Sequence, residues 1–357
     1  GDITVERSDV MRGVGKALGQ RVDMDAVLQS RVRTAIAQAL VASPPRVDAV
    51  VVVRHTGQEI LWRSERDVWS HELTAKAMTT ILANARSAGI SVDSEKALLA
   101  LPTETFVRAL YATSRAEPVS AEYPMFIIYT SGSTGKPKGV VHVHGGYVAG
   151  LVHTMRVSFD AEPGDVIYVI ADPGWITGQS YLISATLASR CTGIVAEGSP
   201  VFPSAGRYAS MVERYGVQIF KAGVTFLKTV MTDPQNVADV KAYDLRTLRV
   251  ATFCAEPVSP AVQQFGMDLM TPQYINSYWA TEHGGIVWTH FYGNDEYPLR
   301  ADAHTYPLPW VVGDVWVATG GDAARPSYQS ADWEEKGEIV ITARLPPVRT
   351  AWKRASK

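Results

Sequence analysis

The feature that most constrains the fold is a regular alternation of apolar runs and helix-like segments between Met125 and Met270. The hydrophobic pattern predicts strands at 125–129, 166–170, 193–196, 217–221 and 248–252, and helices at 146–157, 181–189, 205–215, 226–232 and 260–270. Such alternation is typical of an α/β fold whose mostly parallel sheets are covered by helices. Ligands of these sheets bind at the loops beyond the carboxyl ends of the strands.

The segment before this alternation predicts further elements. Apolar residues recur at helical spacing over 25–41, and a β-branched run at 47–53 is expected to form a buried strand, with 60–62 pairing back as a hairpin. Residues 73–115 are expected to be mostly helical.

After Trp310 the pattern changes, and 311–319 and 338–342 predict strands of a small β-rich unit at the C-terminal end. We therefore predict an N-terminal helical segment (1–46), an α/β core (47–309) and the start of a β-rich subdomain (310–357).

Composition excludes several classes of protein. The 34 basic and 36 acidic residues give a net charge of −2, which argues against a general nucleic-acid binder. The two cysteines, Cys191 and Cys254, allow neither a disulfide framework nor a cysteine-rich zinc site. The chain lacks an apolar run of about 18 residues and begins with a polar, charged segment. We expect a soluble cytoplasmic protein with neither a nucleic acid nor a membrane as partner.

The strongest chemical signal is the loop Tyr-Thr-Ser-Gly-Ser-Thr-Gly-Lys-Pro-Lys-Gly at 129–139. Its glycines allow a close approach to a ligand, and its hydroxyl, backbone N–H and lysine groups suit phosphate oxygens. It is not a Walker A loop, because Thr130 occupies the first glycine position and Pro137 follows the lysine. The candidate phosphate ligands are Thr130, Ser131, Gly132, Ser133, Thr134, Gly135, Lys136 and Lys138.

This loop resembles the phosphate loop of the adenylate-forming superfamily, and two downstream segments strengthen the resemblance. Ala255-Glu256-Pro257 is similar to the segment that lies along the adenine. Residues 276–284, Asn-Ser-Tyr-Trp-Ala-Thr-Glu-His-Gly, resemble the segment whose threonine contacts the α-phosphate and whose glutamate binds Mg²⁺.

The resemblance implies particular roles for these residues. Lys136, Thr281 and Glu282 would be catalytic, and Glu282 with Thr134 would hold the metal. One glutamate suffices chemically, because Mg²⁺ takes few protein carboxylates beside substrate phosphates. Asn276, Ser277, Tyr278, Trp279 and Thr281 would join the nucleotide-binding set.

A fourth segment indicates which branch of this superfamily the chain resembles. Residues 171–181, Ala-Asp-Pro-Gly-Trp-Ile-Thr-Gly-Gln-Ser-Tyr, are similar to a segment of acetyl-CoA synthetases, and the chain most resembles the ligase domain of the multifunctional propionyl-CoA synthases. In this branch an indole at the position of Trp279 closes a small acyl pocket, which implies a C2–C3 acid. Thr177, with Gln179, offers hydrogen bonds to a 3-hydroxyl and favours 3-hydroxypropionate or propionate. The implied pocket residues are Trp175, Ile176, Thr177, Cys254 and Trp279.

The implied reaction is ATP-dependent formation of an acyl-AMP and then an acyl-CoA, with ATP/AMP, Mg²⁺ and coenzyme A as cofactors and co-substrates. The family's C-terminal lid domain, with its Thr-Gly-Asp segment and lysine, does not appear before Lys357. We therefore expect an AMP-binding core fragment, inactive on its own, that belongs with further domains of the same polypeptide. The alternatives are an adenylation domain for another carboxylate and a non-catalytic nucleotide-binding or scaffold remnant.

Overall fold

The structure, a computed structural model, describes residues 49–53, 62–111, 116–130, 138–254, 256, 258–296, 298–301, 305–322, 325–332 and 335–341. The helix expected at 25–41 lies outside the described residues, as do residues 60 and 61 of the expected hairpin. The same holds for several predicted site residues, namely Ser131, Gly132, Ser133, Thr134, Gly135, Lys136, Ala255 and Pro257.

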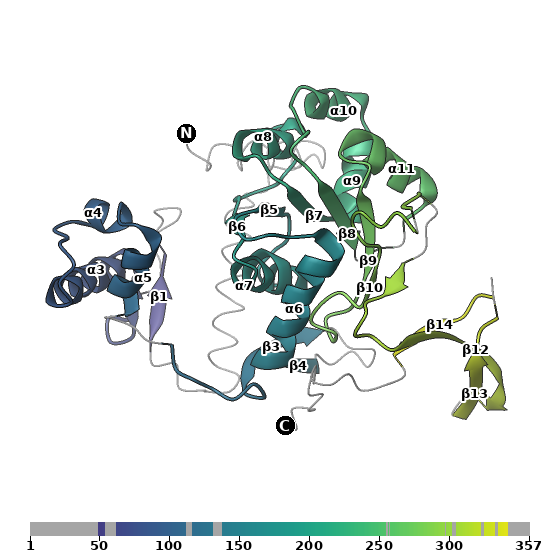
Figure 1. The fold of residues 1–357 in the computed structure, drawn as a ribbon, viewed down its shortest axis with the longest axis horizontal. Coiled ribbons are helices and arrows are strands. Elements are labelled where there is room, and N and C mark those ends of the chain that lie inside the picture. Colours follow the sequence, from purple (N-terminus) through teal and green to yellow (C-terminus); the bar gives the residue numbers. More distant parts are fainter. Residues whose placement is uncertain are drawn as a thin grey trace. The chain divides into compact units, whose positions relative to one another are not determined.

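The chain divides into two compact units, Gly1–Pro118 and Val119–Lys357. In the first, strand β1 (Val50–Val52) pairs in parallel with β2 (Asp67–Trp69). Helices α3 (Ser70–Ser87), α4 (Glu95–Leu99) and α5 (Thr103–Tyr111) follow, which confirms the helical prediction for this region (Figure 1). Ala85, Ile90, Val92, Leu98 and Ala109 form its core.

The prediction of a buried strand at 47–53 was wrong in one respect. β1 is a strand, but Val51 and Val53 are 55% and 70% exposed. Its partner in the described part of the chain is the parallel strand β2, and Trp62 lies in no strand. A β-branched run favours extended backbone, whereas burial depends on what packs against it.

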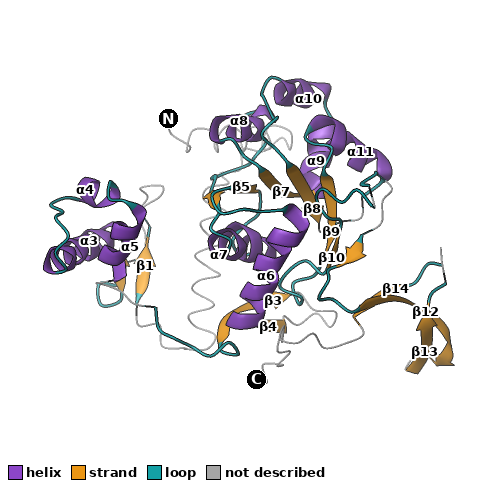
Figure 2. Ribbon diagram, in the orientation of Figure 1, coloured by secondary structure: helices purple, strands orange, loops and turns teal. Residues whose placement is uncertain are grey.

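The second unit is built on a seven-stranded sheet of order β11-β10-β9-β8-β7-β5-β6 (Figure 2). Five neighbouring strands, β9, β8, β7, β5 and β6, are parallel. β10 and β11 extend the sheet beyond β9 in antiparallel pairing. The strands are β5 (Val166–Val169), β6 (Thr192–Ile194), β7 (Ile219–Gly223), β8 (Val250–Cys254), β9 (Tyr274–Tyr278), β10 (Trp288–Thr289) and β11 (Tyr306–Pro307).

Helices bury both faces of this sheet, as predicted. Successive side chains of a strand point to opposite faces, so Ile167 and Ile219 join one core, with residues of α6 and η1, while Tyr168 and Phe220 join another, with residues of α8 and α9. The helices of this unit are α6 (His144–Phe159), the π-helix η1 (Gly178–Ser184), α7 (Ala185–Ala188), α8 (Gly206–Tyr215), α9 (Val224–Met231), α10 (Pro234–Lys241) and α11 (Pro260–Leu269).

The strand predicted at 125–129 is present as β3 (Pro124–Thr130), but it is not part of the parallel sheet. It pairs with β4 (Lys138–Val143) in a two-stranded antiparallel sheet. The chain therefore returns along its own strand after residues 131–137, and the apolar residues of β4 supply a partner that the sequence pattern did not reveal.

The β-rich unit near the C-terminal end is a three-stranded antiparallel sheet of order β13-β12-β14. β12 (Gly313–Asp322) and β14 (Glu338–Ile341) match the two predicted strands. The polar stretch between them contains a third strand, β13 (Arg325–Ser330). Among the described residues, no helix is long and apolar enough to cross a bilayer.

Candidate functional site

A buried histidine joins the strand that leaves the phosphate-type loop to the segment that carries Thr281 and Glu282. His142 of β4 is fully buried, and its Nε2–H donates to the carbonyl oxygen of Thr281 at 3.0 Å. Thr130 at the end of β3 pairs with Lys138 at the start of β4, so both residues flank this loop on one hairpin. The structure thus places β4 beside the 276–284 segment, as a shared phosphate site requires.

Gly284 is required for this contact. Its φ is +77°, and a Cβ at this position would lie 2.8 Å from Nδ1 of His142. A residue with a side chain would therefore strain the backbone and displace the imidazole. The hydrogen bond from His142 to the Thr281 carbonyl therefore depends on a glycine at position 284.

Two hydrogen bonds join residues 284–286, at the end of the 276–284 segment and just beyond it, to the predicted pocket segment 171–181. Ser180 Oγ donates to the Gly284 carbonyl at 2.6 Å and pairs with the Tyr147 hydroxyl at 2.8 Å. The Ile286 N–H donates to the Tyr181 hydroxyl at 2.9 Å. Because Ser180 uses its only hydroxyl hydrogen in the bond to Gly284, the Tyr147 hydroxyl donates to Ser180, and burial raises the pKa of Tyr147 to about 12.

An aromatic cluster lies where these segments meet. The Trp279 ring stands edge-on to the Tyr181 ring, with centroids 5.3 Å apart, and packs against the core. Cys254, at the end of β8, is buried. The ammonium nitrogen of Lys221 on β7 lies 4.7 Å from the centroid of the Tyr181 ring and 5.8 Å from that of Trp279.

Sequence reasoning missed Lys221. The signal was available, because a lysine in the middle of the apolar strand Ile219–Gly223 must be buried if that strand is central in a covered sheet. A buried lysine is rare without a partner.

The other predicted pocket residues differ in how far they are buried. Ile176 is buried and Thr177 half-buried, just before the π-helix η1. Trp175 is 71% exposed, so the structure does not bring it into the Trp279 cluster. Gln179 donates through Nε2 to the Pro173 carbonyl at 2.6 Å, so this bond uses one N–H of the amide group that the sequence predicted for a substrate hydroxyl.

Glu256, in the segment that resembles the adenine-binding one, is fixed by helix α9. Its carboxylate accepts hydrogen bonds from Thr225 Oγ1 and from Lys228 Nζ, the latter at 3.0 Å. The hydrogen bond from Thr225, followed by that from Lys228, lowers the pKa of Glu256. The carboxylate is therefore ionised and oriented at neutral pH.

Among the predicted nucleotide-binding residues of β9, some side chains are buried in the protein and others are exposed. Ser277 is buried and its hydroxyl bonds Thr252 at 2.7 Å and Thr289 at 3.2 Å. The Asn276 carbonyl accepts from Thr289, and Tyr278 is 43% exposed. The Ser277 side chain is thus bound within the protein, and Tyr278 is the exposed side chain of this strand.

Glu282 suits a bound cation. It is half-buried, and its carboxylate has no hydrogen-bond partner in the described part of the chain. Burial lowers the pKa of both His142 and His283, and the nearby charge of Glu282 opposes this shift. The described residues contain no cluster of three or more histidine, cysteine or acidic side chains. A single carboxylate fits Mg²⁺, whose remaining ligands would be substrate oxygens and water.

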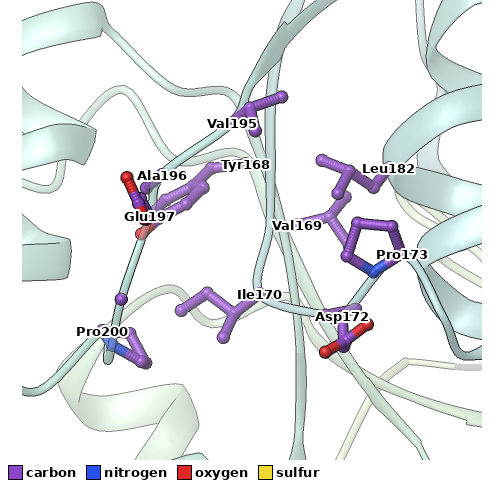
Figure 3. A pocket seen from close by; sticks show the side chains of 12 residues that line it. Tyr168, Val169, Ile170, Asp172, Pro173, Leu182, Val195, Ala196, Glu197 and Pro200 are labelled. Atoms are coloured by element: carbon purple, nitrogen blue, oxygen red, sulfur yellow. The ribbon is translucent and has the colours of Figure 1, made fainter. Parts of the chain in front are cut away.

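A cavity of about 940 Å³ lies at the carboxyl ends of β5 and β6 (Figure 3). It is lined by none of the predicted site residues. Asp172 and Glu197 border it, and Asp172 Oδ1 accepts a hydrogen bond from the Gly174 N–H at 2.6 Å. Carboxylates at its edge repel phosphate groups, so we do not assign the nucleotide to this cavity.

The family of the chain is shown by comparison with known proteins. Residues 25–343 match the family described as AMP-binding enzyme, and the chain belongs to that family, within the adenylate-forming superfamily. It is 34% identical over 313 residues to an acetyl-coenzyme A synthetase of Burkholderia lata and 32% identical over 310 residues to one of Cupriavidus necator. These matches cover 86% and 85% of this chain but 41% and 40% of the relatives. The chain therefore spans about two fifths of the length of the curated relatives it matches.

The buried histidines of the site predict a pH dependence of stability. Burial lowers the pKa of His142 and of His283, so below about pH 6.5 the unfolded chain binds more protons than the folded one. We expect the free energy of unfolding to be constant above that pH and to fall as the pH drops to about 5. Denaturant unfolding across this range measures the slope. His142→Gln should reduce it, whereas the exposed control His71→Gln should not; equal slopes for all three proteins would contradict the assignment.

Proposed function

We propose that this chain is the nucleotide- and acyl-binding core of an ATP-dependent, AMP-forming acid–CoA ligase. The acid is a short-chain carboxylic acid of two or three carbons, with 3-hydroxypropionate and propionate favoured. The observation that carries the proposal is the convergence of two separate segments on residues 281–286: β4 through His142, and 171–181 through Ser180 and Tyr181.

The proposed chemistry relies on positioning and charge neutralisation. A carboxylate oxygen of the acid attacks the α-phosphorus of ATP, and pyrophosphate leaves with the electron pair of the broken P–O bond. The thiolate of coenzyme A then attacks the acyl carbon, and AMP leaves. Residues of the 130–138 loop would hold the phosphates, and Thr281 would contact the α-phosphate. Mg²⁺ held by Glu282 would neutralise phosphate charge.

Such a reaction needs no protein nucleophile. The thiols of Cys191 and Cys254 are both buried, and burial raises the pKa of Cys191, which suits packing rather than attack.

The acid's small size is proposed from Trp279. Its ring lies against Tyr181, so one wall of the pocket would be a rigid pair of aromatic rings. Each added methylene that must be accommodated costs about 1–3 kcal/mol in an apolar pocket. The relation to propionyl-CoA synthase ligase domains, and with it a multifunctional polypeptide, belongs to the same proposal. So do the domain boundaries at residues 46 and 309 and a cytoplasmic location.

Acid-dependent exchange of labelled pyrophosphate into ATP, measured on the full-length polypeptide that contains this chain, tests the function. Acetate, propionate and 3-hydroxypropionate should each support exchange, and coenzyme A should then yield the thioester. Exchange that depends on an amino acid instead would identify an adenylation domain for another carboxylate. Failure to bind ATP by calorimetry would leave the scaffold alternative.

We expect residues 1–357 alone to form acyl-AMP more slowly than the full-length polypeptide by about 100-fold or more, since positioning groups supply much of such catalysis. Single-turnover formation of acyl-AMP measures the difference. Equal rates for the two proteins would contradict the expectation.

A further inference from the structure

Lys221 is a fully buried amine that the proposed chemistry does not use. Its side chain has no exposed surface, and in the described part of the chain its Nζ has no oxygen or nitrogen acceptor, with only the Cys254 thiol as a weak acceptor beside it. The described ion pairs do not include it. Burying an amine without a partner is costly, so its retention calls for an explanation.

The sheet register puts this side chain on the face that carries the proposed acyl pocket. Lys221 pairs with Thr252 on β8 and with Val169 on β5. Cys254 lies two residues beyond Thr252 and so points to the same face. The two aromatic rings that Nζ approaches, Tyr181 and Trp279, cover that face.

The immediate neighbours of the amine offer it no strong hydrogen-bond acceptor. The faces of Tyr181 and Trp279 attract a cation but accept no conventional hydrogen bond. A thiol such as that of Cys254 is a weak acceptor. Burial lowers the pKa of Lys221, and Cys254 opposes this shift. Both the neutral and the charged amine carry N–H donors, so either form needs an oxygen to complete its surroundings.

We propose that Lys221 determines specificity by donating a hydrogen bond to an oxygen on carbon 3 of the acid, which makes the pocket selective for a 3-hydroxy acid over its unsubstituted analogue. This inference rests on the proposed function, because it identifies Trp279 and Cys254 as walls of the acyl pocket. It assigns to Lys221 a role that the sequence had given to Gln179, whose amide is held by its bond to Pro173.

The expected discrimination is large. A site built to hydrogen-bond a substrate hydroxyl rejects the analogue that lacks it by as much as about 10⁴-fold, because the buried protein group is then left unpaired. The aromatic rings already stabilise the amine in part, so we expect kcat/KM for 3-hydroxypropionate to exceed that for propionate by about 100-fold.

The test compares Lys221→Met with the wild type in the full-length polypeptide. Methionine keeps the length and apolar stem of lysine but has no donor. We expect kcat/KM for 3-hydroxypropionate to fall by about 100-fold and that for propionate to stay level or rise. Lys241→Met, on the exposed side of α10, is the matched control and should leave both values unchanged.

A binding measurement keeps the test independent of turnover. Non-hydrolysable 3-hydroxypropionyl and propionyl sulfamoyl-adenosine differ only in the hydroxyl group, and their Kd ratio should approach one in Lys221→Met. The variant should also unfold at a Tm higher than the wild type by about 2 °C or more, because an apolar group replaces a desolvated amine. A preference for the hydroxylated ligand that survives in a folded Lys221→Met protein would overturn the proposal.

Failure of the inference and failure of the proposed function give different results. If the wild type activates all three acids but the ratio of 3-hydroxypropionate to propionate is the same in Lys221→Met, the role of Lys221 is refuted and the ligase function stands. If the wild type activates none of the acids and binds neither analogue, the ligase function itself fails, and the inference fails with it.

Discussion

Replacing Glu282 by glutamine is expected to lower kcat/KM for pyrophosphate release by about 10²–10³-fold, the effect of losing one electrostatic contact to the transition state. The substitution keeps the size of the side chain and removes its charge. In the described part of the chain this carboxylate has no hydrogen-bond partner, and it lies next to Thr281, whose carbonyl is held by His142. Its charge is therefore available to a metal ion, because no hydrogen bond within the described part of the chain uses the carboxylate.

The dependence of the rate on Mg²⁺ concentration separates this role from a structural one. In Glu282→Gln the Mg²⁺ concentration at half-maximal rate should rise, while the Tm changes little. Glu296→Gln, an exposed glutamate of the same unit, serves as the control. A loss of activity at every Mg²⁺ concentration together with a large drop in Tm would assign Glu282 to folding instead.

Replacing Trp279 by alanine is expected to shift the preferred acid from two or three carbons to longer chains. The indole fills space beside Tyr181 and interacts with the Lys221 amine. Its removal should raise kcat/KM for butyrate relative to acetate by about 100-fold, because the ring no longer excludes the two added methylenes, each worth about 1–3 kcal/mol. The partly buried ring also packs on the core, so unfolding should become easier by about 1–3 kcal/mol.

Initial rates with a series of unbranched acids measure this shift. Trp62→Ala, which removes an indole stacked on Trp69 in the first unit, should leave the chain-length profile unchanged. An unaltered profile in a folded Trp279→Ala protein would mean that the indole does not border the acyl pocket.

Much of the fold was predictable because its signals are local. Short apolar runs alternating with amphipathic segments predicted β5, β7 and β8 and, between them, the helices α7, α8 and α9. β9, β10 and α10 were missed. The strand Tyr274–Tyr278 carries mixed polar and aromatic residues, and Ser277 on it is buried only because Thr252 and Thr289 satisfy its hydroxyl.

The site was predictable in its parts rather than in its assembly. The segments containing Glu256, Thr281 and Tyr181 were identified from their residues, and their order along the chain matched a family resemblance that the family comparison supports. The roles of the individual residues stay predictions. His142 as the link to Thr281 was not expected, because the two residues lie 139 positions apart. The apolar strand around Lys221 signalled the burial of its amine, but the approach of that amine to Tyr181 depends on the tertiary fold.

The sequence by itself determined the class of fold, the composition of the phosphate-type loop and the family, since these depend on residue type and short spacing. Only the tertiary structure decided that β3 and β4 form a separate hairpin, that Trp175 is exposed while Trp279 packs on the core, and that Lys221 lies between aromatic rings. The physical reason is that strand pairing and burial are set by contacts between distant segments, which no local pattern of residues encodes.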